Sequence, residues 1–454
     1  MPAATPTAQA SAGRASLLTA LIGIVVFACY NANGREVGSY DSQAAKYTVY
    51  QLVAHRTFKL DSIVARQPAL RERVVFATST DGHTRLATPV MPVLLAWLPS
   101  ELLHASGLVP LRPPNASIFA KAAASLLVTL AVIFVFHAAR RRTDDTWAAL
   151  IALGFGLGTS AWPTASQTLW QHESVLAGLS LAVLCLAPPA PQLSRSRLWL
   201  AAVGLGIAGA ARPQVAAAVL VIAVSVLART RRASAAVTLL PVAAAAAATL
   251  AVNLWWFGHP LGAMAGFEAQ MHAKVHAVSG SFSTAPWTGA LGLLVSPSRG
   301  LLVFSPIVLL AATGAGAARR EGWAGDLRWC ALAAAAQFGL YSAYSVWWGG
   351  HTYGPRYLTD LLPLLVPLVA AGSGVLRARR PARIVAAAAL AWSIALAATG
   401  AFCYPAEAWN ADPTDIDRDH QRLWDWTDPQ FVRCWRTGLS PQNLSLWPPA
   451  GAAR

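Results

Sequence analysis

The sequence predicts an all-α polytopic membrane protein with about eleven transmembrane helices. Of the 454 residues, 55% are hydrophobic and only 12% are charged, and many apolar segments are long enough to cross roughly 30 Å of hydrocarbon. A soluble domain carries about a quarter charged residues, so composition excludes a soluble protein, a disordered chain and a coiled coil. The expected spans are 15–30, 117–138, 147–162, 173–188, 197–211, 214–228, 235–256, 299–317, 327–346, 358–376 and 384–402.

A further apolar segment, 87–103, contains Pro89, Pro92 and Pro99, and we interpret it as a helix that lies at the membrane interface without crossing. With this segment outside the count and the N-terminus in the cytoplasm, all Arg-rich connections fall on one side, as the positive-inside rule requires. That side holds 16 basic and 4 acidic residues, which is most of the formal net charge of +15. The excess of basic residues therefore indicates membrane topology and contact with anionic lipids, and not nucleic-acid binding. No cleavage signal follows the first span, which we expect to be a retained anchor.

Three long segments fall on the outer side: the first loop 31–116, the loop 257–298 and the C-terminal tail 403–454. Because the connections on the other side are short, we expect the chemistry on the outer face. Cys403 and Cys434 both lie in the tail, where oxidation is permitted, and we expect them to pair, with two unpaired thiols as the alternative. The expected organisation is a transmembrane domain, 1–402, and a small extracytoplasmic cap, 403–454.

Asp41 follows the first span on the outer side and precedes a stretch, 43–53, with helical spacing. A carboxylate beside a helix on the membrane surface could take a proton from an acceptor hydroxyl at the lipid interface. The alternative is a helix N-cap, a common role of Asp.

Several arginines lie in or beside predicted spans, where a guanidinium is costly and indicates function. They are Arg85, Arg212, Arg299 and Arg356. Guanidinium groups are always charged and bind oxyanions with two N–H groups, so several on one face could hold a phosphate. Arg212 and Arg356 are the best candidates because Pro and Gly neighbours hold each in a tight turn. Snorkelling toward lipid headgroups is the alternative for each.

His172 and Glu173 begin a span on the outer face, where they could orient a sugar hydroxyl or ligate a cation; hydrogen bonding at the helix end is the alternative. A Gly-x-Gly-x-x-Gly pattern at 204–209 lies inside a span, so it indicates close helix packing rather than nucleotide binding.

Metal-binding patterns are weak. His272 and His276 have the i, i+4 spacing of zinc ligands, near Glu268 and His259, but a polar loop helix also explains them. The acidic residues of 415–419 alternate as in a calcium loop, but His420 stands where the tight turn needs Gly. We assign no metal site from the sequence.

These features resemble the GT-C superfamily of integral membrane glycosyltransferases, especially its aminoarabinose and protein mannosyl transferase branch. The resemblance covers about residues 15–400 through short motifs. The segment 41–60 resembles the acidic residue and juxtamembrane helix of the family's first outer loop, and 88–97 resembles its Pro-rich interfacial segment. The turn 204–213 resembles one that carries a basic residue, and 348–358 resembles a motif of uncharacterised bacterial members.

Two positions depart from the family pattern. Its Asp-Glu pair reads Asp41-Ser42 here, and the Lys-Pro that often precedes the interfacial segment is missing, with Arg85 as the nearest cation.

The resemblance implies an inverting glycosyltransferase that moves a sugar from a polyprenyl-phosphate donor to an envelope glycan, lipid or protein. Asp41 would be the general base, and Arg212, Arg356 and Arg85 would hold the donor phosphate. Further candidates for substrate contact are His172, Glu173, Trp348, His351 and Tyr353. No cofactor is required, although a divalent cation is compatible. The expected location is a bacterial inner membrane, with the N-terminus cytoplasmic, the C-terminus extracytoplasmic and lipids as partners.

Two other classes stay open. A transporter or flippase of lipid-linked sugars predicts charged residues midway along the spans and a pseudo-repeat, and the sequence has neither. A non-catalytic envelope protein predicts that Asp41→Asn leaves function intact.

Overall fold

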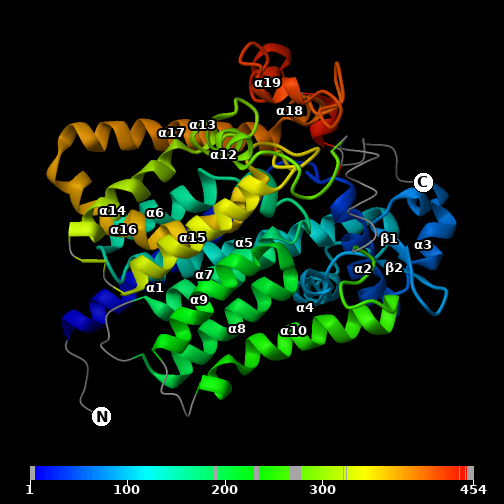
Figure 1. Cartoon of the computed structure of the whole chain (residues 1–454), viewed down its shortest axis with the longest axis horizontal. Coiled ribbons are helices and arrows are strands. Elements are labelled where there is room, and N and C mark those ends of the chain that lie inside the picture. The colour runs from blue at the N-terminus through cyan, green and yellow to red at the C-terminus, as the bar shows by residue number, and fades with distance from the viewer. Residues whose placement is uncertain are drawn as a thin grey trace.

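The computed structural model describes residues 6–187, 193–229, 235–264, 278–320, 322–323, 325–438, 440–444 and 446. Over this part the chain is mostly α-helical, with a single two-stranded sheet, so the expected α-helical class is confirmed (Figure 1). The long helices are α1 (Pro6–Asn31), α5 (Ala116–Ala139), α6 (Asp145–Leu157), α7 (His172–Leu186), α8 (Arg195–Ala211), α9 (Ala216–Ala228), α10 (Ala235–Phe257), α15 (Gly325–Ala343), α16 (Leu362–Ala378) and α17 (Arg380–Phe402). The shorter elements are α2 (Tyr40–His55), α3 (Asp61–Arg66), β1 (Phe76–Thr78), β2 (Thr84–Leu86), α4 (Met91–Ala105), α12 (Pro286–Val295), α13 (Leu301–Phe304), α14 (Leu310–Arg320), α18 (Tyr404–Ala408) and α19 (Val432–Thr437).

Within the described residues, five helices are long and apolar enough to cross a membrane. They are Gly13–Asn31, Pro113–Ala139, Val237–Phe257, Arg356–Ala378 and Arg380–Phe402. Four shorter apolar helices add to them: Asp145–Leu157, His172–Leu186, Pro213–Ala228 and Pro286–Val295. One α-helix covers most of each of the ten predicted segments other than 299–317, although α6 ends at Leu157 within 147–162 and α16 begins at Leu362 within 358–376. The number of eleven crossings and their orientation stay predictions.

The predicted span 299–317 is not one helix. It is divided into α13, a 3-10 turn at Pro306–Leu309 and α14. Pro306 has no backbone N–H and disfavours helical backbone at Ser305, whose φ and ψ are −140° and 60°. The prediction of one continuous helix over 299–317 is therefore wrong, because the hydrophobicity of the segment does not report the break at Pro306.

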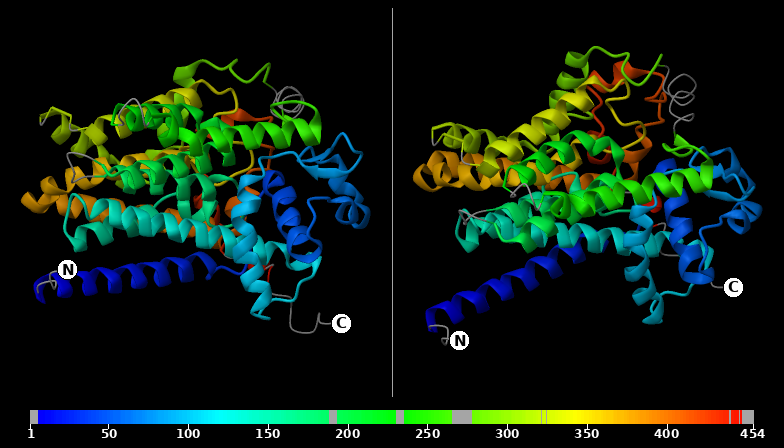
Figure 2. Two further views of the ribbon diagram at one scale, coloured as in Figure 1. Left: turned by 90° about the horizontal axis from the view of Figure 1, so that it is seen from below. Right: turned by 60° about the horizontal axis from the view of Figure 1, so that its bottom comes forward.

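The helices α2 and α4 lie across one end of the bundle of long helices instead of along it (Figure 2). They pack on each other and on α5, and the hairpin of β1 and β2 adjoins α2. On α4, Leu98 and Leu102 are exposed although they are apolar. This arrangement agrees with the interpretation of 87–103 as an interfacial helix.

The three long segments that the sequence places on the outer side contact one another or their neighbouring helices. Arg35 of the first loop pairs with Glu407 of the tail, the Thr80 amide donates to the Trp256 carbonyl at the end of α10, and Ser296 donates to the Leu423 carbonyl. The tail is thus held against the helical bundle, and the domain boundary at residue 402 stays a prediction. Cys403 and Cys434 form a disulfide within it.

The Arg-rich connections also lie together. Arg142 pairs with Asp326, and Arg377 pairs with Asp144 across 2.9 Å. The close packing inferred for the glycine pattern is present as well, since a Cβ added at Gly204 of α8 would lie 2.4 Å from the Gly178 carbonyl oxygen of α7. Gly204 therefore permits the contact of two helices, as expected from small-residue packing.

Candidate active site

Two lysines anchor the connection between α1 and α2, and this connection positions Asp41. The Lys46 ammonium lies 2.7 Å from Glu36 Oε2, and Thr168 donates to Glu36 Oε1 at 2.6 Å. Burial would raise the pKa of Glu36, but the charge and hydrogen bonds of Lys46 together with the hydrogen bond from Thr168 hold it below its ordinary value. Lys121 of α5 is buried and donates to the side chains of Asn33 and Gln167 at 2.7 and 2.6 Å.

Asp41 stands in the first turn of α2, and Ser39 is the residue that caps this helix. The Ser39 hydroxyl accepts the Asp41 amide proton at 3.4 Å. The alternative interpretation of Asp41 as an N-cap therefore does not describe this helix, and the carboxylate is available for another role.

The carboxylate of Asp41 forms an ion pair with Arg356, with Oδ2 2.9 Å from Nη1. The Asp41 side chain is 47% exposed, whereas that of Arg356 is 9% exposed. The pair joins residues that are distant in the sequence, so the fold brings the predicted base and one predicted phosphate-binding residue together. Its two members face different surroundings, one toward solvent and one toward the protein interior.

Arg212 is held by Asp360, a fully buried carboxylate that follows Arg356 on the same 3-10 turn, Arg356–Leu361. Arg212 Nε lies 3.0 Å from Asp360 Oδ2, and the Tyr341 hydroxyl donates to the same oxygen at 2.5 Å. His172 Nδ1 lies 2.7 Å from Asp360 Oδ1. One carboxylate thus orients an arginine, a histidine and a tyrosine from three other elements. Snorkelling does not describe Arg212, because the guanidinium is buried and paired.

One aromatic ring connects the two arginines. The Tyr357 ring centre lies 5.4 Å from Arg212 Cζ and 5.3 Å from Arg356 Cζ. The ring of Tyr341 stacks on that of Tyr357, with ring centres 5.2 Å apart. The Trp170 ring centre lies 4.9 Å from Arg356 Cζ. Cation–π contacts of this kind stabilise buried guanidinium groups. The two predicted phosphate-binding arginines therefore share one aromatic site beside Asp41.

Three polar atoms near this site are buried without a hydrogen-bond partner in the part of the chain that the structure describes: His172 Nε2, Glu173 Oε2 and Arg356 Nε. The residue before His172, Gln171, adopts the left-handed backbone with φ of 79°. A non-glycine residue in this conformation costs about 1–3 kcal/mol, and such residues are enriched at functional sites. At the start of α7 the turn places His172 against Asp360, while Glu173 Oε1 accepts a hydrogen bond from Ser174.

The other candidates lie elsewhere. Arg85 pairs with Asp81 across 2.5 Å and packs against Trp255 and Trp256, so no described contact brings it to Arg212 or Arg356. Tyr353 is buried and donates to the Leu396 carbonyl of α17 at 2.8 Å.

Trp348 and His351 contact the tail instead of the arginines. Trp348 Nε1 donates to Asp417 at 2.8 Å, and His351 Nε2 lies 2.9 Å from Asp415 Oδ1. Arg299 is fully buried between the same loop and the tail, where it donates to the Trp348 carbonyl and to Asn410. Its role is therefore to join tail and bundle. The histidine pair His272 and His276 lies outside the described residues.

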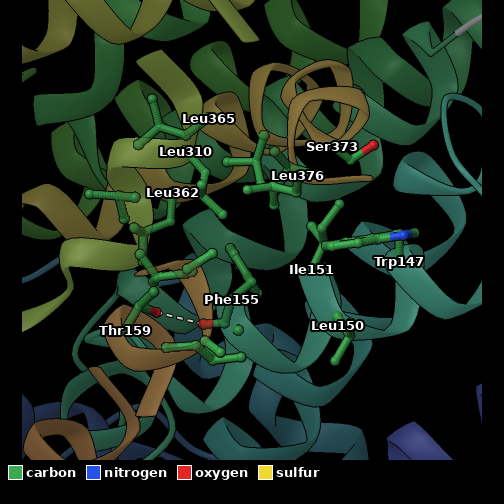
Figure 3. A pocket seen from close by; sticks show the side chains of 18 of the residues that line it. Trp147, Leu150, Ile151, Phe155, Thr159, Leu310, Leu362, Leu365, Ser373 and Leu376 are labelled. Atoms are coloured by element: carbon green, nitrogen blue, oxygen red, sulfur yellow. Dashed lines mark hydrogen bonds between the residues drawn. The ribbon is translucent and has the colours of Figure 1, made fainter. Parts of the chain in front are cut away.

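An apolar cavity of about 290 Å³ lies along α16, with lining residues from Leu362 to Leu376 of this helix (Figure 3). Leu362, close to Asp360 in sequence, lines its first part, while Leu376 and Arg383 line its far part. The wall is formed by α6, α14, α16 and α17 and is almost entirely aliphatic or aromatic. Such a cavity suits a hydrocarbon chain.

Sequence reasoning missed two charged residues of this region. Lys121 is the only charged residue of its predicted span, and Asp360 stands near the start of another. An ionisable residue inside an apolar segment is by default a functional candidate, so both could have been found by that rule.

No family model matches the chain, and no curated protein matches it. Among solved structures, ArnT from Cupriavidus metallidurans, bound to undecaprenyl phosphate, is similar at 14% identity with a TM-score of 0.47, over 96% of this chain and 76% of that chain. The archaeal oligosaccharyltransferase AglB from Archaeoglobus fulgidus, in complex with an inhibitory peptide and a dolichol-phosphate, is similar at 12% identity with a TM-score of 0.46, over 92% of this chain and 60% of that chain.

Proposed function

We propose that this protein is an inverting membrane glycosyltransferase of the GT-C type, using a polyprenyl-phosphate sugar as donor and an envelope glycan, lipid or protein as acceptor. The observation that carries the proposal is the meeting of Asp41, Arg356 and Arg212 at one aromatic site. A general base and two permanent cations are the groups that such a transfer needs.

In the proposed reaction the acceptor oxygen attacks the anomeric carbon while the bond from that carbon to the phosphate oxygen breaks. Asp41 takes the acceptor proton, and the polyprenyl phosphate leaves with the electron pair of the broken bond. The charges of Arg212 and Arg356 stabilise the phosphate as negative charge develops on it. Arg356 Nε is buried without a described partner, so its N–H could donate a hydrogen bond to a phosphate oxygen.

The polyprenyl chain would occupy the apolar cavity along α16. Its first lining residue, Leu362, follows the turn that carries Arg356 and Asp360, so a phosphate at the arginines would lead directly into it. Ile151, Phe155 and Leu365 line the same cavity (Figure 3).

The test is a transfer assay with the purified full chain in lipid nanodiscs and a panel of radiolabelled polyprenyl-phosphate sugars, read as release of polyprenyl phosphate. Asp41→Asn should lower turnover by about 100- to 10,000-fold, the contribution of a general base. Arg356→Ala and Arg212→Ala should also weaken binding of polyprenyl phosphate. Arg112→Ala, an exposed arginine in the same outer loop, is the matched control and should change neither.

Unchanged turnover in Asp41→Asn, with normal folding, refutes the assigned base. Failure of the unaltered chain to release polyprenyl phosphate from any donor of the panel favours the non-catalytic class. Movement of the intact donor across a proteoliposome membrane without release of polyprenyl phosphate favours a transporter or flippase instead.

A further inference from the structure

We propose a binding site for a divalent transition-metal ion, such as Zn²⁺, between the loop that precedes Arg356 and the C-terminal tail. The ligands are His351 from the loop and Asp415 and Asp417 from the tail. One donor atom from each of the three lies within 4.8 Å of the others. The site is separate from the arginines and does not depend on the proposed transferase activity.

The distances fit a metal ion. His351 Nε2 lies 2.9 Å from Asp415 Oδ1 and 3.6 Å from Asp417 Oδ2. Around a tetrahedral zinc ion with bonds of about 2.1 Å, neighbouring ligand atoms are about 3.4 Å apart. The two measured separations lie on either side of that value, so an ion needs only small side-chain movements.

The ligand types fit as well. Imidazole nitrogen suits zinc and related transition metals, whereas calcium and magnesium prefer sites made only of oxygen. Two carboxylates close to one imidazole give a net negative site, which a divalent cation neutralises. His351 and Asp415 are partly exposed, at 33% and 42%, so water can complete the coordination.

Surrounding groups orient the ligands. The Trp348 indole donates to Asp417 Oδ1 at 2.8 Å, which leaves Oδ2 directed toward His351. The Asp417 amide donates to Asp415 Oδ1 at 2.9 Å. Outer-shell hydrogen bonds of this kind set ligand direction and metal affinity.

The location gives the ion a consequence for the tail. Asp415 and Asp417 lie within the segment closed by the disulfide between Cys403 and Cys434, while His351 lies shortly before Arg356. A bound ion would join the tail to the loop that carries Arg356, and would slow proteolysis of the tail.

Isothermal titration of Zn²⁺ into the EDTA-treated full chain in detergent tests the proposal. We expect one saturable site that is lost in His351→Gln and Asp417→Asn and weakened roughly tenfold in Trp348→Phe. Two matched controls should bind as the unaltered chain does. His83→Gln removes an imidazole that lies 3.2 Å from the single carboxylate of Asp61, and Asp419→Asn removes a carboxylate that contacts Thr414.

X-ray absorption at the zinc edge of the unaltered protein gives a second readout that needs no variant. We expect scattering from one imidazole and otherwise oxygen ligands. Absence of saturable binding, unchanged affinity in His351→Gln, or scattering from two imidazoles would overturn the proposal. Loss of binding in His272→Gln/His276→Gln would do the same, by moving the ion to the other histidine pair.

Discussion

Replacing Asp360 by Asn removes the one carboxylate that orients Arg212, His172 and Tyr341. The substitution keeps the side-chain volume but leaves the Arg212 guanidinium, 8% exposed, without its charge partner at 3.0 Å. Removing one member of a buried ion pair costs about 3–5 kcal/mol, because the other charge stays desolvated. We expect Asp360→Asn to lower the free energy of unfolding by that amount.

The variant Tyr341→Phe sets a scale for this loss. It removes one hydrogen bond to the same carboxylate, at 2.5 Å, and should cost about 1.5–3 kcal/mol. Arg212→Met should resemble Asp360→Asn, and the double variant Arg212→Met/Asp360→Asn should be less destabilised than the sum of the two by at least about 1 kcal/mol. Glu72→Gln, an exposed acid in the same protein, is the control with little expected change.

Unfolding is measured by SDS titration in mixed micelles, with far-UV circular dichroism as the readout. Additive losses in the double variant would refute the idea that Asp360 acts through Arg212. A loss in Tyr341→Phe greater than that in Asp360→Asn would show that the hydroxyl, and not the charge, organises the cluster.

Two further predictions concern the outer loop and the tail. The lowered pKa of Glu36 means that this residue contributes stability above its unfolded value near 4.5 and loses it as the pH falls, so Glu36→Gln should flatten the acid side of a stability–pH curve. Burial raises the pKa of Glu407 despite Arg35, so Glu407 changes stability with pH in the opposite direction. A stability–pH curve of Glu36→Gln with the same acid side as the unaltered chain would contradict the stabilising role of Glu36. The disulfide joins residues separated by 31 positions, for which loop entropy gives about 4 kcal/mol. Cys403→Ala/Cys434→Ala should therefore lower the midpoint of thermal unfolding, and equal midpoints with and without the disulfide would contradict this.

Much of the fold follows from hydrophobicity and charge alone. The long apolar segments became helices because their backbone groups have no other partner in hydrocarbon, and the Arg-rich connections gathered at one end. Hydrophobicity did not predict the helix break at Ser305, because it depends on side-chain polarity and not on backbone geometry. Pro306, read as a helix-breaking residue, would have indicated it.

The site was predictable in part, since Asp41, Arg212 and Arg356 were singled out and the fold brings them together. What the sequence could not provide was the choice among arginines. Arg85 and Arg299 are equally basic and equally close to apolar segments, but Arg85 pairs with Asp81 and Arg299 joins the tail. Arg212 and Arg356 have partners as well, and what distinguishes them is a tertiary contact, since both lie against the ring of Tyr357 and Arg356 reaches Asp41.

The unequal exposure of Asp41 and Arg356 explains how one ion pair could serve two substrates. The acid is the exposed member, so an acceptor that arrives from the aqueous side reaches it first. The arginine is the buried member and stands on the turn that precedes the cavity-lining Leu362, so in the proposed reaction the lipid-bound phosphate would reach it along the cavity. In the absence of substrates each group satisfies the charge of the other, which limits the desolvation cost of keeping Arg356 buried. Under the proposed function, a donor phosphate that binds Arg356 would compete with Asp41 for the guanidinium, and the released carboxylate would then accept the proton of the acceptor.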